Sequence, residues 1–138
     1  MLPTCLDAAG VEVDPKRFDG RSLLAPIRGR ADRWRPWIDL EHDTCYDRSN
    51  HWTALTDGRY KYVFHCVDGE QQLFDLRDDP GELRDLASEP EHQAKVKLWR
   101  SRMVEHLAER GAPFVVAGDL GLRPGRMLYS PHYPGRKR

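Results

Sequence analysis

The side chains best suited to chemistry gather in the polar stretch EHDTCYDRSNHW, residues 41–52, and in a His-Cys pair at residues 65–66. Histidine nitrogen and cysteine sulfur are ligands that zinc prefers, and four of them complete a tetrahedral site. The four candidates are His42, Cys45, His51 and Cys66. Only the His42-x-x-Cys45 spacing resembles a usual zinc-binding pair, because the other two residues are dispersed. A zinc site therefore remains an alternative to a set of partly buried structural residues.

A nucleophile and its base could come from the same stretch, with Cys45 or Ser49 activated by His42 or His51. The surrounding sequence shows no nucleophile elbow, no oxyanion loop and no acid that would orient the histidine. The stretch GLRPGR, residues 121–126, lacks the lysine and the strand–loop–helix setting of a phosphate-binding loop. The residues alone therefore do not favour catalysis by this chain.

Glu41 and His42 come at the end of a predicted strand and before a polar loop, where folds commonly present binding groups. A histidine at such a position can donate a hydrogen bond to an anionic substrate or orient a sugar hydroxyl. The alternative is an ordinary exposed histidine. Residue chemistry leaves both interpretations open.

Alternating apolar residues and turn signals predict a sheet around these positions. The residues of RYKYVFHC that share one face are Tyr60, Tyr62, Phe64 and Cys66. Asp57-Gly58 and Asp68-Gly69 predict hairpins on either side, and the first is expected to be a type I′ turn with positive φ twice. The predicted strands cover residues 34–42, 51–56, 59–66 and 71–76, in meander order and antiparallel.

An antiparallel sheet with one apolar face needs a cover, and the sequence supplies a helix at about residues 89–110. Its apolar stripe, spaced by three, four and four residues, is Val96, Trp99, Met103 and Leu107. The stretch DPGE, residues 79–82, predicts one short helical turn before it, through Leu83 and Leu86. The predicted fold is α+β: a four-stranded antiparallel sheet packed against one long C-terminal helix, with an extended N-terminal connector and an irregular tail.

The two ends of the chain lack a period of their own. Residues 1–33 contain apolar residues broken by proline and glycine, which is typical of a connector that packs onto something else. Residues 34–111 form the predicted sheet-and-helix unit. Residues 112–138 are rich in glycine and proline and are expected to form an irregular tail that lies across a surface, or to be disordered where that surface is missing.

The bulk composition excludes several classes of partner. The 22 basic and 22 acidic residues balance, so no net field favours nucleic acid or an anionic membrane. No run of residues is apolar enough to predict a transmembrane helix. Three cysteines without framework spacing indicate a reducing compartment. No export signal is predicted at the start, so the cytoplasm is the default expectation.

Five motifs in order carry a resemblance: LPTCLDAAGVEV…FDGRSLLAPIRG, LTDGRYKYV, QLFDLRDDPGELRDLA, WRSRMVEHLAER and GLRPGRMLYSP. On these motifs the chain resembles the C-terminal part of the type I sulfatases, the formylglycine-dependent arylsulfatase-like enzymes of the alkaline-phosphatase superfamily. The resemblance covers nearly the whole chain. It implies a large α/β catalytic domain followed by a smaller subdomain, whose four-stranded sheet and long helix agree with the fold that patterning predicts.

The resemblance also implies what this chain lacks. The family's nucleophile is formylglycine, made from the first residue of a C/S-x-P-x-R motif, and its metal is calcium or magnesium held by paired aspartates and an Asp-Asn or Asp-His pair. None of Cys5, Cys45 and Cys66 is followed by x-P-x-R, and no cluster of carboxylates is legible. The formylglycine and the metal are therefore expected in a catalytic domain outside this chain, which would not be catalytic by itself.

The leading hypothesis is a detached C-terminal subdomain: a truncated gene product, a gene fragment or half of a split protein. Its expected partner is a sulfatase catalytic domain, in cis or in trans, with a sulfate ester as the substrate of the complete enzyme. His42, together with Glu41, is expected to face the substrate, and His51 and Asn50 are further candidates. The alternatives are a stand-alone binding or interaction module of the same fold and a zinc-stabilised module.

One physical consequence separates a fragment from a self-sufficient module. If the connector and the tail normally lie on a large domain, apolar surface is exposed when that domain is absent. The exposed surface is expected at Leu23, Leu24 and Ile27 and at residues 114–116. Because exposed apolar patches promote association, the chain is expected to self-associate.

Overall fold

A computed structural model describes residues 1–12, 14–30, 34–43, 47 and 50–125. The chain divides into two compact units, Met1–Pro36 and Trp37–Arg138, and each is described by itself. Within the described residues, no helix is both long and apolar enough to cross a membrane.

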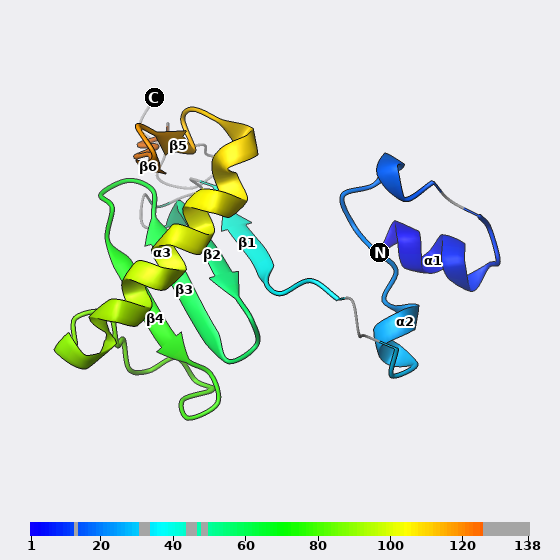
Figure 1. Ribbon diagram of the computed structural model, residues 1–138, viewed down its shortest axis with the longest axis horizontal. Coiled ribbons are helices and arrows are strands. Elements are labelled where there is room, and N and C mark those ends of the chain that lie inside the picture. Colours follow the sequence, from blue (N-terminus) through cyan, green and yellow to red (C-terminus); the bar gives the residue numbers. More distant parts are fainter. Residues whose placement is uncertain (13, 31–33, 44–46, 48–49, 126–138) are drawn as a thin grey trace, which may run out of the picture. The chain divides into compact units, whose positions relative to one another are not determined.

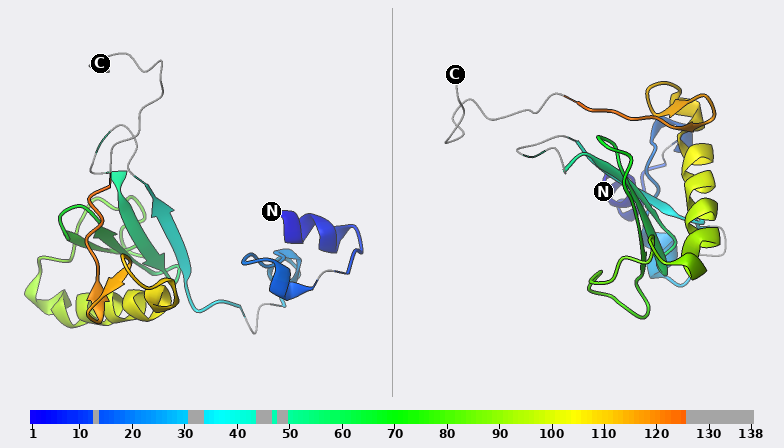
Figure 2. Two further views of the ribbon diagram at one scale, coloured as in Figure 1. Left: turned by 90° about the horizontal axis from the view of Figure 1, so that it is seen from above. Right: turned by 90° about the vertical axis from the view of Figure 1, so that its left-hand side faces the viewer.

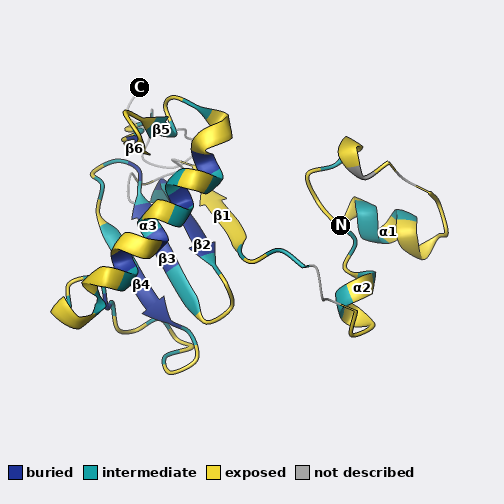
Figure 3. Ribbon diagram, in the orientation of Figure 1, coloured by how far each residue is buried: buried dark blue, intermediate teal, exposed yellow. Residues whose placement is uncertain are grey.

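The first unit contains short helices joined by polar contacts. Its elements are α1 (Leu2–Ala8), the 3₁₀ turn η1 (Pro15–Arg17) and α2 (Leu24–Ile27). The backbone N–H of Leu23 donates to Thr4 Oγ1 at 3.1 Å, and the Ser22 hydroxyl donates to the Asp7 carboxylate. None of the described residues of this unit is buried, as the teal and yellow colouring of Figure 3 shows. A unit without buried residues has little hydrophobic stabilisation of its own.

The second unit is a sheet covered by a helix on one face (Figures 1 and 2). The strands are β1 (Ile38–His42), β2 (Trp52–Thr56), β3 (Tyr60–His65) and β4 (Gln71–Asp75), antiparallel in the order β1-β2-β3-β4. Helix α3 (Gln93–Leu107) is extended by the 3₁₀ turns η3 (Pro90–His92) and η4 (Ala108–Arg110). The predicted α+β fold is confirmed.

The core lies between α3 and the sheet face that it covers. The helix contributes the predicted stripe, all of it buried: Val96, Trp99, Met103 and Leu107. The sheet contributes Leu55, Tyr62, Phe64, Cys66 and Leu73, each at most 1% exposed. Because alternate residues of a strand share a face, the spacing in the sequence fixes which side chains meet the helix.

The opposite face of the sheet, called the outer face from here on, is also apolar. Ala54, Val63 and Phe74 form a second buried cluster there, with Trp52 and Leu76 packed against it. In β1 the outer-face positions are Ile38 and Leu40, which lie opposite Thr56 and Ala54 in the register. These two side chains are 48% and 40% exposed. An antiparallel sheet that meets water on one face normally carries polar residues there, so the outer face of β1 departs from that pattern.

The hairpin between β2 and β3 forms where the Asp57-Gly58 signal predicts it, but the turn is not the expected type I′. Gly58 has a φ of +90°, whereas Asp57 is not among the residues with positive φ. Instead the Asp57 carboxylate accepts hydrogen bonds from the backbone N–H groups of Arg59 and Tyr60 at 2.9 and 2.8 Å. The aspartate therefore stabilises the turn through its side chain, as in other Asx turns.

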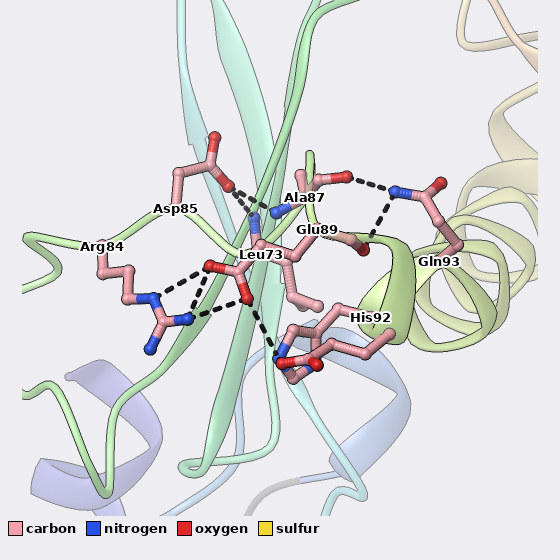
Figure 4. A network of polar contacts seen from close by, with 8 residues as sticks. Leu73, Arg84, Asp85, Ala87, Glu89, His92 and Gln93 are labelled. Carbon is pink, nitrogen blue, oxygen red and sulfur yellow. Dashed lines mark hydrogen bonds and ion pairs between the residues drawn. The ribbon is translucent and has the colours of Figure 1, made fainter.

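The connection from β4 to α3 is held by a polar network (Figure 4). The Asp85 carboxylate accepts from the backbone N–H groups of Leu73 and Ala87 at 3.0 and 2.9 Å. The Arg84 guanidinium donates to both carboxylate oxygens of Glu89, each at 2.9 Å. These contacts fix the start of α3 relative to β4.

The short helical turn predicted before α3 is absent, so that prediction is wrong. Glu82 has a φ of +53°, in the left-handed region, which a right-handed helical turn excludes. Leu83 is 91% exposed while Leu86 is buried, so the two do not form one apolar face. The loop extends along β4 instead, where the Leu86 N–H donates to the Leu73 carbonyl oxygen at 2.8 Å.

The segment after α3 contains a small hairpin that the sequence did not predict. Strands β5 (Val115–Val116) and β6 (Asp119–Leu120) pair antiparallel and are drawn in orange in Figure 2. The two residues between them, Ala117 and Gly118, have φ of +52° and +81°, which is the requirement of a type I′ turn. Leu120 is buried in the core under α3. The hairpin therefore belongs to the packed unit.

Candidate functional site

A cavity of about 250 Å³ opens at one end of the sheet. It is lined by residues 41–43 at the end of β1, residues 51–53 at the start of β2, and the side chains of Arg110, Phe114 and Arg123. Three parts of the chain that are far apart in the sequence thus converge: the β1–β2 strand ends, the end of the helix, and the segment that follows the β5–β6 hairpin.

A larger hollow of about 730 Å³ lies in the first unit, lined by residues of its loops and of α1. None of its lining residues whose burial is described is buried, and no described buried side-chain polar atom there lacks a partner. A binding site normally combines enclosure with convergent polar groups. We therefore place the candidate site at the smaller cavity, whose lining includes the buried residues His51 and Thr53 together with several convergent polar groups.

Glu41 and His42 line this cavity from opposite faces of the sheet. Glu41 lies opposite Thr53 on the helix-covered face and forms an ion pair with Arg110. His42 lies opposite Trp52 on the outer face, and the two rings stack with centroids 6.0 Å apart. Successive residues of a strand alternate in this way, so the predicted pair does not act from one side.

The tautomer of His42 follows from its hydrogen bond. Its Nδ1 lies 2.7 Å from the backbone carbonyl oxygen of Asn50, and a carbonyl oxygen can only accept. Nδ1 must therefore carry the proton, which leaves Nε2 as an acceptor in the neutral ring. Neutral His42 can accept a hydrogen bond from a hydroxyl, and it donates to an anion through Nε2 only when protonated. Asn50 thus contributes to the site by orienting His42.

Among the four predicted substrate-binding residues, His51 is the most enclosed, at 9% exposed. Its Nε2 lies 3.7 Å from Asp43 Oδ1, and its Nδ1 is buried without a hydrogen-bond partner. Burial lowers the pKa of His51, and the positive charge of Arg123 lowers it further, although the charge of Asp43, the backbone of Arg123 and the charge of Glu41 act in the opposite direction. The ring is therefore neutral at neutral pH.

Arg123 is one of the residues of this site that the sequence did not predict. Its Nη2 donates to Thr53 Oγ1 at 2.7 Å and to Cys66 Sγ at 2.9 Å, and its backbone N–H donates to the Cys66 carbonyl oxygen at 2.6 Å. The guanidinium carbons of Arg123 and Arg110 lie 4.3 and 3.5 Å from the centroid of the Phe114 ring. Cation–π contacts of this kind hold both arginines at the cavity wall.

The four candidate zinc ligands do not form one cluster in the structure. Cys45 lies outside the described residues, as does Ser49, the second candidate nucleophile. The Cys66 thiol, whose pKa is raised by burial, is already in contact with Thr53 and the Arg123 guanidinium. A cation at this sulfur opposes the approach of a metal ion. In the described part of the chain, His42, His51 and Cys66 are not among the side chains whose potential ligand atoms cluster together.

One group of potential ligands does cluster, at the opposite end of α3. Glu89, Glu91 and His92 have ligand atoms within 4.8 Å of one another. However, both oxygens of Glu89 are engaged by Arg84, as Figure 4 shows. Calcium and magnesium prefer several oxygen ligands free to converge on the ion. Glu89 therefore offers an ion at this cluster no carboxylate oxygen that is free of Arg84.

The backbone at Gly121 decides whether Arg123 reaches the cavity. A Cβ added at Gly121 would lie 2.1 Å from the Pro113 carbonyl oxygen, so Gly121→Ala must displace this segment. We expect the free energy of unfolding to fall by about 1–3 kcal/mol, and residues 121–123 to exchange their amide hydrogens faster. Urea denaturation and hydrogen exchange measure the two effects.

Gly20→Ala is the matched control, since its added Cβ would meet only Pro3 Cγ at 3.7 Å, an ordinary contact. It should leave the unfolding free energy nearly unchanged. Equal unfolding curves for the two variants would contradict the tight approach at Gly121.

Solved structures place this fold in a class. Over 81% of this chain and 24% of the other, it matches a 2-O GAG sulfatase with a TM-score of 0.68 and 25% identity. A phosphonate monoester hydrolase from Silicibacter pomeroyi matches over 78% of this chain and 24% of its own, with a TM-score of 0.60 and 28% identity. The class is a sulfatase C-terminal subdomain of the alkaline-phosphatase superfamily. Residues 1–109 match the family described as N-sulphoglucosamine sulphohydrolase, C-terminal, and the chain belongs to this family.

Curated relatives agree with this assignment. The chain is 33% identical over 110 residues to an arylsulfatase of Clostridium perfringens, which covers 80% of this chain and 22% of the relative. It is 32% identical over 139 residues to a delta 4,5-hexuronate-2-O-sulfatase of Bacteroides thetaiotaomicron, covering 99% of this chain and 28% of the relative. The chain thus spans about a quarter of the length of these relatives.

Proposed function

We propose that this chain works as the C-terminal subdomain of a sulfatase: it supports the catalytic domain, walls one side of the substrate cleft, and does not hydrolyse sulfate esters by itself. The observation that carries the proposal is the partly uncovered apolar outer face beside the polar cavity. A sheet covered by α3 on one face and apolar on the other is suited to lie between the helix and a second domain.

The outer face offers a defined docking surface. Its buried cluster of Ala54, Val63 and Phe74 continues into Ile38 and Leu40 of β1, which are exposed. Strand β1 is also the edge strand of the sheet, so its outer backbone groups are open to a partner. We assign this surface to a catalytic domain, because the matched relatives are about four times as long as the part that this chain covers.

The first unit supports the same proposal. Leu23 and Ile27 are 43% and 72% exposed, and no described residue of the unit is buried. A segment with apolar side chains and no core gains stability by packing on another surface. A catalytic domain would supply that surface, and in its absence self-association is expected.

The chemistry is assigned to the catalytic domain. The formylglycine and the calcium or magnesium ion would lie there, since this chain has neither the C/S-x-P-x-R motif nor a fitting set of described ligands. The contribution of this chain to a sulfate ester would then be binding contacts from the cavity, with His42 and Glu41 as the leading residues and His51 and Asn50 beside them.

The docking surface can be tested with a hybrid. The catalytic part of the Clostridium perfringens arylsulfatase is produced without the segment that this chain matches, and this chain is added in trans. We expect the chain to bind it and to increase hydrolysis of an aryl sulfate, whereas the chain alone releases no sulfate. Leu40→Asp should weaken the binding roughly tenfold, because it places a charge on the buried apolar contact.

Leu98→Asp is the matched control. Leu98 is 49% exposed on α3, close to the 40% of Leu40, but it lies on the helix and away from the outer face. The control should bind like the wild type. If both substitutions weakened binding to the catalytic part equally, or if the pure chain released sulfate, the proposal would be wrong.

A further inference from the structure

The cavity is lined by two residues that each carry a buried side-chain nitrogen without a hydrogen-bond partner among the described residues. Arg123 Nη1 and His51 Nδ1 are the described side-chain atoms that are buried without a hydrogen-bond partner. Leaving a buried polar group unpaired is costly, and the cost is larger for the charged guanidinium of Arg123. The neutral ring of His51 can donate from Nδ1 in the tautomer that carries its proton there. Both residues line the same cavity. Buried groups of this kind normally bind a further partner, such as an ion or a water molecule.

The charges around the cavity specify the kind of ligand. Arg110 is paired with Glu41, and Asp43 lies near His51. Among the described residues Arg123 forms no ion pair. Its guanidinium donates to the Thr53 hydroxyl and the Cys66 sulfur, and its backbone N–H donates to the Cys66 carbonyl oxygen. The guanidinium of Arg123 is therefore not neutralised by a direct ion pair among the described residues, although the carboxylates of Glu41 and Asp43 line the same cavity. Guanidinium groups bind planar or tetrahedral oxyanions through two N–H groups at once.

We propose that Arg123 and His51 form a subsite for a single oxyanion group, a sulfate or a carboxylate, within this cavity. The cavity of about 250 Å³ has room for such a group. The proposal rests on the proposed function for its choice of anions, since a sulfatase meets both free sulfate and acidic sulfated substrates.

The guanidinium of Arg123 is fixed at the subsite by contacts with three residues. Thr53 and Cys66 hold one end of the guanidinium, and the Phe114 ring lies against its plane. An arginine fixed in this way loses little side-chain entropy when it binds an anion. The same contacts explain why an anion would be preferred at Arg123 over the many exposed arginines of the chain.

The test uses the 138-residue chain alone, without any catalytic domain. Sodium sulfate, sodium glucuronate and sodium chloride are titrated separately at constant ionic strength, while the backbone amide signals are followed by NMR. We expect saturable shifts at His51, Thr53, Cys66 and Arg123 with at least one of the first two salts and none with chloride. A response to sulfate alone assigns the subsite to sulfate groups, and a response to glucuronate alone assigns it to a sugar carboxylate.

Substitutions decide whether these two residues carry the binding. Arg123→Gln should raise the dissociation constant about tenfold or more, as expected for the loss of a charge-assisted hydrogen bond. Arg77→Gln removes the same charge from an exposed arginine between β4 and α3 and should change it less than about twofold. If Arg123→Gln loosens the tail, His51→Gln provides an independent variant, with an expected weakening of about threefold to about tenfold.

The outcomes separate this inference from the proposed function. Absence of saturable shifts with both oxyanions, or unchanged affinity in Arg123→Gln and His51→Gln, overturns the subsite and leaves the docking experiment untouched. Conversely, oxyanion binding by the chain would stand even if the chain failed to bind a catalytic domain.

Discussion

Trp99→Ala is expected to lower the free energy of unfolding of the sheet-and-helix unit by about 3–5 kcal/mol. Trp99 is 1% exposed at the centre of the stripe by which α3 covers the sheet. Its removal leaves a cavity that the surrounding strands cannot fill without moving. Since a small domain has roughly 5–15 kcal/mol in total, this one substitution should bring the unit close to its folding limit. Urea denaturation followed by near-ultraviolet circular dichroism measures the change.

Leu98→Ala is the control for this experiment. Leu98 is the preceding residue on the same helix and is 49% exposed, so its truncation removes few buried contacts. We expect a change of less than about 1 kcal/mol. If Leu98→Ala were as destabilising as Trp99→Ala, the assignment of the core to the predicted face of α3 would be incorrect.

The sheet and the long helix were predictable because each depends on a local pattern of apolar residues and turn signals. The three, four and four spacing of Val96, Trp99, Met103 and Leu107 is a helical period, and all four are buried. The alternation in β3 and the Asp-Gly dipeptides predict strands and hairpins in the same local way. Local patterns are less informative about turn type, as Asp57 and Glu82 show. There the side-chain hydrogen bonds of Asp57 and the left-handed backbone of Glu82 depend on the surrounding structure.

The candidate site was only half predictable. Glu41, His42, Asn50 and His51 are neighbours in the sequence, so their common position at one end of the sheet follows from the strand ends. Arg123 contacts Thr53 and Cys66 across 70 and 57 residues, and no local spacing encodes such a contact. It depends on the β5–β6 hairpin, whose turn residues Ala117 and Gly118 lack the usual Asn-Gly or Asp-Gly signal.

The alternation of strand residues changes how the predicted pair can work. Glu41 points to the helix-covered face and is held by Arg110, whereas His42 points to the outer face and is held by Asn50 and Trp52. Glu41 therefore shapes the cavity through Arg110, and His42 is the one that presents its ring on the outer face of the sheet. If a catalytic domain covers the outer face, His42 lies where the two domains would meet.

His42→Ala is accordingly expected to reduce kcat/KM of the hybrid enzyme by about tenfold to about 100-fold, mainly through a higher KM. The proton on Nδ1 leaves Nε2 as the acceptor for a substrate hydroxyl, and alanine removes it. His42→Gln keeps an acceptor at a similar distance from the backbone and should recover part of the affinity. His92→Ala removes an imidazole at the opposite end of α3 and should leave both constants unchanged. Steady-state hydrolysis of a sulfate ester that carries sugar hydroxyls measures all four proteins, and a KM unaffected by His42→Ala would exclude His42 from the substrate cleft.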